Sequence, residues 1–312
     1  MAAEDRAARV AAISLFIDDT NMWPLGGVAA LLDFCEAQGV RGKISLIPGL
    51  DVKPGQRHMG QKLAPDAVAF MSEMALAGAR GFDVHMELMT HKGLWDFAAD
   101  RVREDGQHEG VWLHEPEVPV AAYEAYFEGV LAAARAGGVA INGVTVPGCD
   151  CSACSSRLAQ LRAEDHEGPS ENAWQALLDL AERGGFGVPV VAVFHADADE
   201  ARPMRIMASR DGFGVYDARM DVIDLDLLRQ GALTRADVDL FITEDGQSGH
   251  IADLVRAGAE TCFFDMHWMK MNPANDEGWA AFREVIRRIN ATLGDRVAWV
   301  KPSDYGRRLL DG

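Results

Sequence analysis

Two adjacent aspartates, Asp18 and Asp19, end the first apolar run of the chain, residues 13–17. The run has the length of a buried strand, and no charge interrupts it before Asp18. Two carboxylates this close repel each other, so both stay ionised only with help from a cation, a proton or hydrogen bonds. A divalent metal on one carboxylate, with the other left as a base, is one solution. A solvated strand end in which an aspartate caps a turn is the other.

A second pair of candidate metal ligands is Glu87 and His91, the first and last residues of the pentapeptide Glu-Leu-Met-Thr-His. If the preceding strand gives way to a helical turn, both side chains share a face and reach one cation. With Asp19 they form a mixed oxygen and nitrogen ligand set, which suits zinc and also manganese, cobalt or nickel. His85 alternates onto the side of Glu87 and is a substitute ligand. The alternative is that His91 caps the strand while Glu87 pairs with a lysine such as Lys92.

Three later apolar runs also end in carboxylate or imidazole groups. The carboxyl ends of parallel strands meet at one rim of a barrel, so these groups are expected to converge with the two pairs above. The groups are His195 and Asp197 at the end of residues 188–196, Glu244 and Asp245 after residues 238–243, and Asp265 and His267 after residues 261–264.

Three thiols, Cys149, Cys151 and Cys154, lie within six residues after a predicted strand. This spacing indicates a second metal site or a structural site, and a structural zinc would take a fourth ligand such as His166. The alternative is a tight loop of reduced cysteines that packs under a neighbouring segment.

Aromatic and imidazole side chains supply candidate substrate-binding residues. A sugar ring has apolar faces that suit aromatic stacking, so we assign this role to Trp95 and Trp268, and add His195 because it ends a predicted strand. The alternative is that the two indoles are ordinary rim or core residues.

The elements that must position these groups alternate between apolar runs and helical patterns from one end of the chain to the other. This alternation predicts a parallel sheet covered by helices. No Gly-x-Gly-x-x-Gly follows the first strand and no Gly-x-x-x-x-Gly-Lys-Ser/Thr occurs, so nucleotide-binding folds lack their fingerprint. We predict an α/β fold, a distorted (β/α) barrel of seven or eight parallel strands, as a single domain over residues 1–312 with an insertion around residues 92–117.

The composition excludes some partners. The formal net charge of −18 argues against nucleic acid and anionic membranes, which require a basic face. No apolar run approaches the roughly 20 residues of a membrane span, and the first residues lack the pattern of a signal peptide. Five cysteines are a sparse and odd set, expected as thiols or ligands. We therefore expect a cytoplasmic protein with a small-molecule or oligosaccharide substrate, and leave open whether it forms a homo-oligomer.

The order of these features resembles the polysaccharide deacetylase (NodB-like) superfamily: a strand ending in Asp-Asp, a second strand followed by a ligand pair four residues apart, and a late strand ending in a histidine. The resemblance implies a distorted barrel in which a metal-bound water hydrolyses N-acetyl or related amide and ester bonds. It implies Asp18 as general base, Asp19 and His91 as metal ligands, and His267 as the proton donor to the leaving group.

The chain departs from the family pattern at two places. Glu87 stands where the family has the first histidine of its ligand pair, and residues 146–148, Val-Pro-Gly, stand where an Arg-x-Pro segment is usual. The extra negative charge of Glu87 lowers the Lewis acidity of a bound metal. Two alternative functions therefore remain open. One is a metal-free glycoside hydrolase with a carboxylate pair drawn from Asp18, Asp19, Glu87 and Glu244. The other is a non-catalytic carbohydrate-binding barrel.

Overall fold

The computed structural model describes residues 10–48, 65–105, 107–148, 152–163, 168–194, 204–224 and 233–312. They fall into two compact units. The first contains the described residues of 1–44, 79–82 and 220–301, and the second contains those of 45–78, 83–219 and 302–312. No helix among the described residues is long and apolar enough to cross a membrane.

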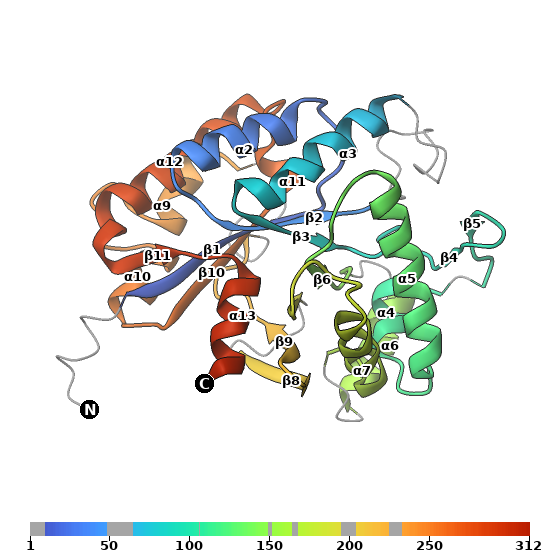
Figure 1. The fold of residues 1–312 in the computed structure, drawn as a ribbon. Coiled ribbons are helices and arrows are strands. Elements are labelled where there is room, and N and C mark those ends of the chain that lie inside the picture. Colours follow the sequence, from blue (N-terminus) through green and yellow to red (C-terminus); the bar gives the residue numbers. More distant parts are fainter. Residues whose placement is uncertain are drawn as a thin grey trace. The chain divides into compact units, whose positions relative to one another are not determined.

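The first unit is built around β1 (Ala11–Asp18), in which every residue is buried. On one side β1 pairs in parallel with β10 (Thr261–His267), and it also pairs in parallel with β11 (Val297–Trp299) and with the start of β2 (Gly42–Leu46). The register sets Asp18 opposite His267, so both lie at the carboxyl ends of neighbouring strands. The other elements of this unit are α2 (Gly27–Ala37), η2 (Arg235–Asp237), α9 (Val238–Phe241), α10 (His250–Arg256), α11 (Trp268–Met271), α12 (Asp276–Leu293) and η3 (Gly294–Arg296) (Figure 1).

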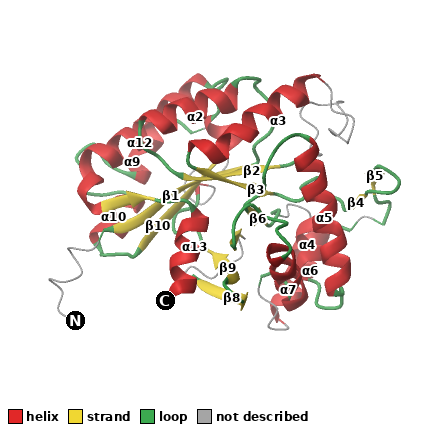
Figure 2. Ribbon diagram, in the orientation of Figure 1, coloured by secondary structure: helices red, strands yellow, loops and turns green. Residues whose placement is uncertain are grey.

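Helices α2 and α12 lie side by side in the first unit (Figure 2). Phe34 of α2 contacts Trp279 and Phe282 of α12, with ring centroids 5.8 and 5.6 Å apart. Asn275 caps α12 by accepting a hydrogen bond from the Gly278 N–H at 3.0 Å. The buried residues of α12 recur three and four apart, which is the pattern of a helix that buries one face.

The second unit contains strands in the order β3, β6, β7, β9, β8; the first four pair in parallel, and β8 pairs with β9 in the antiparallel direction. Helix α5 packs against α7, where Arg183 pairs with Glu124 at 2.8 Å. The elements of the second unit are α3 (Pro65–Ala77), β3 (Phe82–Met86), β4 (Trp95–Asp96), β5 (Arg101–Val102), α4 (Glu109–His114), α5 (Val120–Ala136), β6 (Gly143–Thr145), α6 (Ser152–Ala163), α7 (Glu171–Glu182), β7 (Val190–Phe194), β8 (Arg205–Arg210), β9 (Phe213–Ala218) and α13 (Pro302–Asp311). The short helix η1 (Gly78–Arg80) has residues in both units, and so has β3, whose first residue Phe82 belongs to the first unit.

The predicted α/β class is confirmed, as is the predominance of parallel strands that a (β/α) barrel requires. The single domain over residues 1–312 stays a prediction. The expected insertion around 92–117 contains β4, β5 and α4. The C-terminal residues form α13, whose first turn is held by Asp83: its carboxylate accepts hydrogen bonds from the Ser303 N–H at 2.7 Å and hydroxyl at 2.9 Å.

One predicted strand is wrong. Residues 238–243 form helix α9 and not a strand. Val238 and Phe241 are buried on one face of the helix, whereas Leu240 is exposed. A run of six residues, four of them apolar, does not distinguish a short buried helix from a strand, because periodicity needs a longer segment to become visible.

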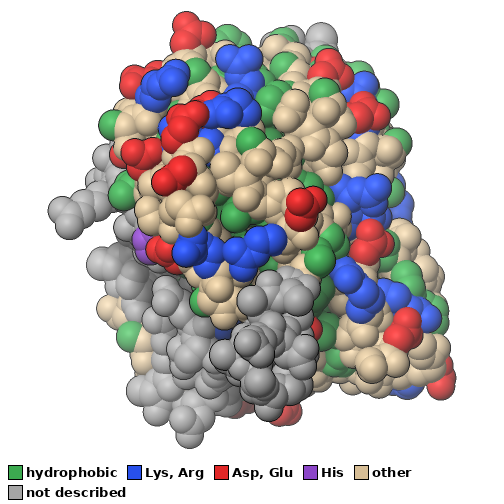
Figure 3. Space-filling view, turned by 90° about the vertical axis from the view of Figure 1, so that its left-hand side faces the viewer, with side chains coloured by type: hydrophobic (Ala, Val, Ile, Leu, Met, Phe, Trp, Pro, Cys, Tyr) green, Lys and Arg blue, Asp and Glu red, His purple; other side chains and the backbone are tan. Residues whose placement is uncertain are grey.

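The surface of the face drawn in Figure 3 mixes basic side chains with acidic ones. Among the side chains drawn in colour, lysine and arginine alternate with aspartate and glutamate (Figure 3).

Candidate functional site

Three acidic and imidazole side chains of the first unit meet at the carboxyl end of β10: Asp224, Asp265 and His267. Their ligand atoms all lie within 4.8 Å of one another. His267 Nδ1 lies 2.7 Å from Asp224 Oδ1 and 3.3 Å from Asp265 Oδ2. The His267 N–H donates to Asp224 Oδ2 at 2.9 Å, and the Asp224 N–H donates to Asp265 Oδ1 at 2.7 Å. Two carboxylates therefore hold the imidazole through Nδ1 and leave Nε2 for chemistry.

The charges of this cluster favour a protonated imidazole. Burial alone would lower the pKa of His267, but the hydrogen bonds to Asp224 and Asp265 outweigh it and raise the pKa to about 11. Burial raises the pKa of Asp265 above its usual value, while the hydrogen bond with His267 lowers it. The ammonium of Lys270, itself buried, lies 3.6 Å from Asp224 Oδ1. Two cationic side chains thus compensate two carboxylates in a largely buried site.

Asp18 lies beside this cluster, as the register partner of His267 on the neighbouring strand. It forms an ion pair with Lys43 of β2, a fully buried residue whose Nζ also lies 5.3 Å from the ring centroid of Phe16. The sequence left open whether a cation, a proton or hydrogen bonds compensate the two adjacent aspartates, and for Asp18 the structure shows the cation of a lysine. Lys43, the first residue of the predicted strand at residues 43–48, was the signal that could have revealed this partner.

Asp19 is half-buried in the first unit and has a left-handed backbone, with a φ of 57°. Its carbonyl oxygen accepts a hydrogen bond from Asn21 Nδ2 at 3.2 Å, and Asn21 Oδ1 accepts one from the Trp23 N–H at 3.0 Å. The chain therefore turns sharply directly after β1, and the two aspartates take different surroundings: Asp18 in the core and Asp19 at the turn.

Glu87 and His91 contact each other in the second unit, with 2.9 Å between Oε1 and Nδ1. Glu87 is buried, its Oε2 accepts a hydrogen bond from Ser45 Oγ at 2.6 Å, and the side chain of His91 is 20% exposed. The two side chains meet without the helical turn that we considered: Leu88 and His91 both have a left-handed backbone, with φ values of 53° and 66°. Asp19, the third predicted ligand, belongs to the other unit, so the three-ligand centre stays a prediction.

The two tryptophans assigned to substrate binding are core residues. Trp268 has no exposed surface, its Nε1 donates to the Trp23 carbonyl oxygen at 2.7 Å, and its ring packs against Gly27 so closely that a Cβ there would lie 3.0 Å away. Trp95 is 5% exposed. Neither ring offers a face to a sugar in this structure, because each fills an apolar interior position.

Several predicted site residues lie outside the described residues: His166, Cys149, Cys151, His195 and Asp197. Of Cys154 the structure describes only its place in α6. The second metal site and the role of His195 therefore stay predictions.

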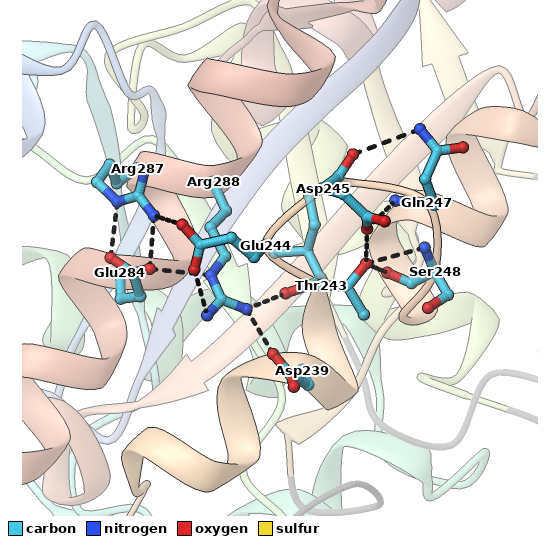
Figure 4. A network of polar contacts seen from close by, with 10 residues as sticks. Asp239, Thr243, Glu244, Asp245, Gln247, Ser248, Glu284, Arg287 and Arg288 are labelled. Carbon is cyan, nitrogen blue, oxygen red and sulfur yellow. Dashed lines mark hydrogen bonds and ion pairs between the residues drawn. The ribbon is translucent and has the colours of Figure 1, made fainter.

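Glu244 and Asp245 do not end a strand, since residues 238–241 are helical, and both lie in an exposed polar network (Figure 4). Glu244 forms ion pairs with Arg287 at 3.0 Å and with Arg288 at 3.3 Å, which connect the loop between α9 and α10 to α12. A hydrogen bond from Thr243 lowers the pKa of Asp245. These contacts link the residues after α9 to α12, and a role of Glu244 in glycoside hydrolysis stays a prediction.

No protein-family model matches this chain, and no curated protein matches it either. Among solved structures, one described as "T48 deacetylase with substrate" is 10% identical with a TM-score of 0.42, covering 95% of this chain and 90% of that one. An exo-beta-1,4-mannosidase, Op5Man5 from Opitutaceae bacterium strain TAV5, is 11% identical with a TM-score of 0.38, covering 91% of this chain and 60% of that one. Both are distant structural similarities, so the functional argument rests on the residues of this chain.

Proposed function

We propose that this protein is a metal-dependent hydrolase that cleaves an amide or ester bond, with His267 as the proton donor. The observation that carries the proposal is the hydrogen bond between Asp224 and His267 in a buried cluster of two carboxylates. A histidine that is protonated at neutral pH and held through Nδ1 can donate from Nε2 to a leaving amine or alkoxide. The carboxylates orient the ring and keep its positive charge in place.

Asp18 is the proposed general base. Its place opposite His267 in the register supports the role, because an acid and a base for one bond must face the same reacting atoms. The ion pair with Lys43 favours the ionised carboxylate, the form that accepts a proton. Breaking an amide bond needs both transfers: a proton leaves the attacking water for Asp18, and a second proton passes from His267 to the leaving nitrogen.

Glu87 and His91 are the proposed metal ligands, with Asp19 as the third. The donor atoms of Glu87 and His91 fit the role, because a carboxylate oxygen and an imidazole nitrogen lie 2.9 Å apart and Ser45 anchors the second carboxylate oxygen. A divalent metal, zinc in the first instance, would supply an acidic water and polarise a carbonyl when bound. We assign the metal to this pair rather than to His267, because the cations of the His267 cluster already compensate its carboxylates.

The substrate class that we propose is an N-acetylated carbohydrate or a small amide. The support is the order of residues along the chain: an Asp-Asp strand end, a ligand pair four residues apart and a late histidine. The fold is compatible, since parallel strands carry Asp18 and His267 to one edge of the sheet.

The test is an acetate-release screen against N-acetylated sugars and small amides, with protein loaded with zinc. We expect His267→Asn to reduce kcat by about 10²- to 10⁴-fold, as for the loss of a general acid. Asp245→Asn, at an exposed position, is the matched control and is expected to keep full activity. Wild-type activity in the His267→Asn variant would remove the histidine from the mechanism. Activity that persists after chelation, with release of sugar rather than acetate, would favour the glycoside hydrolase instead.

A further inference from the structure

The carboxylate of Glu109 holds a turn that lies 20 residues earlier in the chain. Glu109 begins α4, inside the segment 92–117, and has no exposed surface. Its Oε1 accepts a hydrogen bond from the Met89 N–H at 2.9 Å, and its Oε2 accepts one from the Thr90 N–H at 3.0 Å. A side chain of the segment 92–117 therefore satisfies backbone donors of the turn at residues 88–91.

Two further donors complete the surroundings of this carboxylate. The His91 N–H and the Tyr126 hydroxyl also donate to Glu109, and the Tyr126 oxygen in turn accepts a hydrogen bond from the Trp95 N–H at 2.9 Å. Burial raises the pKa of Glu109 to about 7, while these four hydrogen bonds lower it. Groups that all donate suit an ionised carboxylate, which only accepts.

The turn itself needs such support. Leu88 and His91, at its two ends, have left-handed backbones, which side chains of L-residues rarely adopt and which persist only where surrounding contacts hold them. The contacts of Glu109 fall on Met89, Thr90 and His91, so they fix this conformation directly. The Thr90 hydroxyl adds a further bond inside the turn, donating to the Gly93 carbonyl oxygen at 2.6 Å.

Helix α4, which carries Glu109, is itself tightly packed. A Cβ added at Gly110 would lie 2.2 Å from the Pro147 carbonyl oxygen, so α4 approaches that backbone as closely as glycine allows. The Glu109 N–H donates to the Lys92 carbonyl oxygen at 2.6 Å. The carboxylate therefore has little freedom to follow the turn if the turn moves.

We propose that Glu109 is a positioning residue that sets the geometry of the pair Glu87 and His91. It holds the backbone between them in the one conformation that brings their Oε1 and Nδ1 atoms to 2.9 Å. What the pair binds rests on the proposed function, whereas the geometric role does not. The segment 92–117 thereby supplies the side chain that fixes the turn between the two proposed metal ligands.

Two measurements on two variants test this role. Glu109→Gln keeps the shape of the side chain but sets an amide donor against backbone donors, and Tyr126→Phe removes one of the four donors. The matched control is Glu115→Gln, from the same segment, whose carboxylate accepts hydrogen bonds from Arg157 at 2.8 and 2.6 Å. The measurements are metal-free crystal structures and the zinc affinity by calorimetry.

We expect Glu109→Gln to separate Glu87 from His91 beyond hydrogen-bond distance and to weaken zinc binding by about 10- to 100-fold, the usual cost of losing an outer partner of a metal ligand. Glu115→Gln should change neither. An unchanged pair with unchanged zinc affinity in Glu109→Gln overturns the proposal, and Tyr126→Phe decides in the same way if Glu109→Gln does not fold. A wild-type protein that binds no zinc contradicts the proposed function, and the crystal structures still decide whether Glu109 sets the pair.

Discussion

Replacing Asp224 by asparagine tests the electrostatic reasoning on His267 most directly. Asp224 accepts two hydrogen bonds from His267, one from the backbone N–H and one from Nδ1, and the buried ammonium of Lys270 is 3.6 Å away. Asp224→Asn keeps the shape of the side chain and removes one negative charge. Because an adjacent carboxylate shifts a pKa by about 1–3 units, the pKa of His267 should fall by that amount. Asp265 remains and should keep it above the usual value of a histidine.

The same change should alter stability in a pH-dependent way. The pKa of His267 in the folded protein, about 11, lies above its ordinary value of 6.5, so protonation stabilises the fold. This stabilisation is fully present below about pH 6.5 and is lost as the pH rises through the folded-state pKa. Breaking a buried ion pair by removing one partner costs about 3–5 kcal/mol. We therefore expect Asp224→Asn to lose roughly 3 kcal/mol at pH 6, and less at pH 10.

Two assays measure these effects. Nuclear magnetic resonance of the imidazole gives the titration midpoint of His267 in both proteins, and urea unfolding at pH 6, 8 and 10 gives the free energy of unfolding. The Asp245→Asn variant, at an exposed site, controls for the loss of a carboxylate. A wild-type His267 that titrates near pH 6.5, or a midpoint unmoved by Asp224→Asn, refutes the reasoning.

Three further predictions follow from other contacts. Lys43→Met leaves the buried carboxylate of Asp18 without its cation and should cost about 3–5 kcal/mol in urea unfolding, whereas Lys92→Met, at an exposed position, should cost almost nothing. Gly42→Ala would set a Cβ 1.8 Å from the Leu15 carbonyl oxygen, so it should lower the free energy of unfolding by about 3 kcal/mol or more. Gly78→Ala is the control, because a Cβ at Gly78 would have no atom within 4 Å. Equal melting temperatures of the two variants would contradict the close approach at Gly42. Chelation should abolish hydrolysis and zinc should restore it, while activity that survives chelation would exclude a catalytic metal.

The class of fold follows from local patterns. The predicted strand at residues 13–17 is buried throughout, as its lack of charged residues indicates, and α12 shows the amphipathic spacing expected of a covering helix. The predicted strand at 238–243 failed, because so short a run carries no periodicity. The assignment of Trp268 to substrate binding failed for a related reason, since sequence shows that a ring is apolar but not which side of it is covered.

The candidate site also contains residues that the sequence identifies and residues that it does not. Asp18 and His267, at the ends of apolar runs, could be singled out from the sequence, since a strand that stops on a charged residue is a local feature. The residues that pair with them could not be identified from the sequence. Lys43 lies 25 residues from Asp18, and Asp224 lies 43 residues from His267 in a segment with no strand pattern of its own.

The sequence by itself determined the alternation of strands and helices and the charged residues at the strand ends, because burial and backbone preference act over a few neighbouring residues. Only the tertiary structure decided which charge faces which: Lys43 for Asp18, Asp224 for His267, and Glu109 for the turn at residues 88–91. The physical reason is that a buried charge is stabilised by whichever group the folded chain brings to it, and sheet register and helix packing set that approach across distances that no local pattern records.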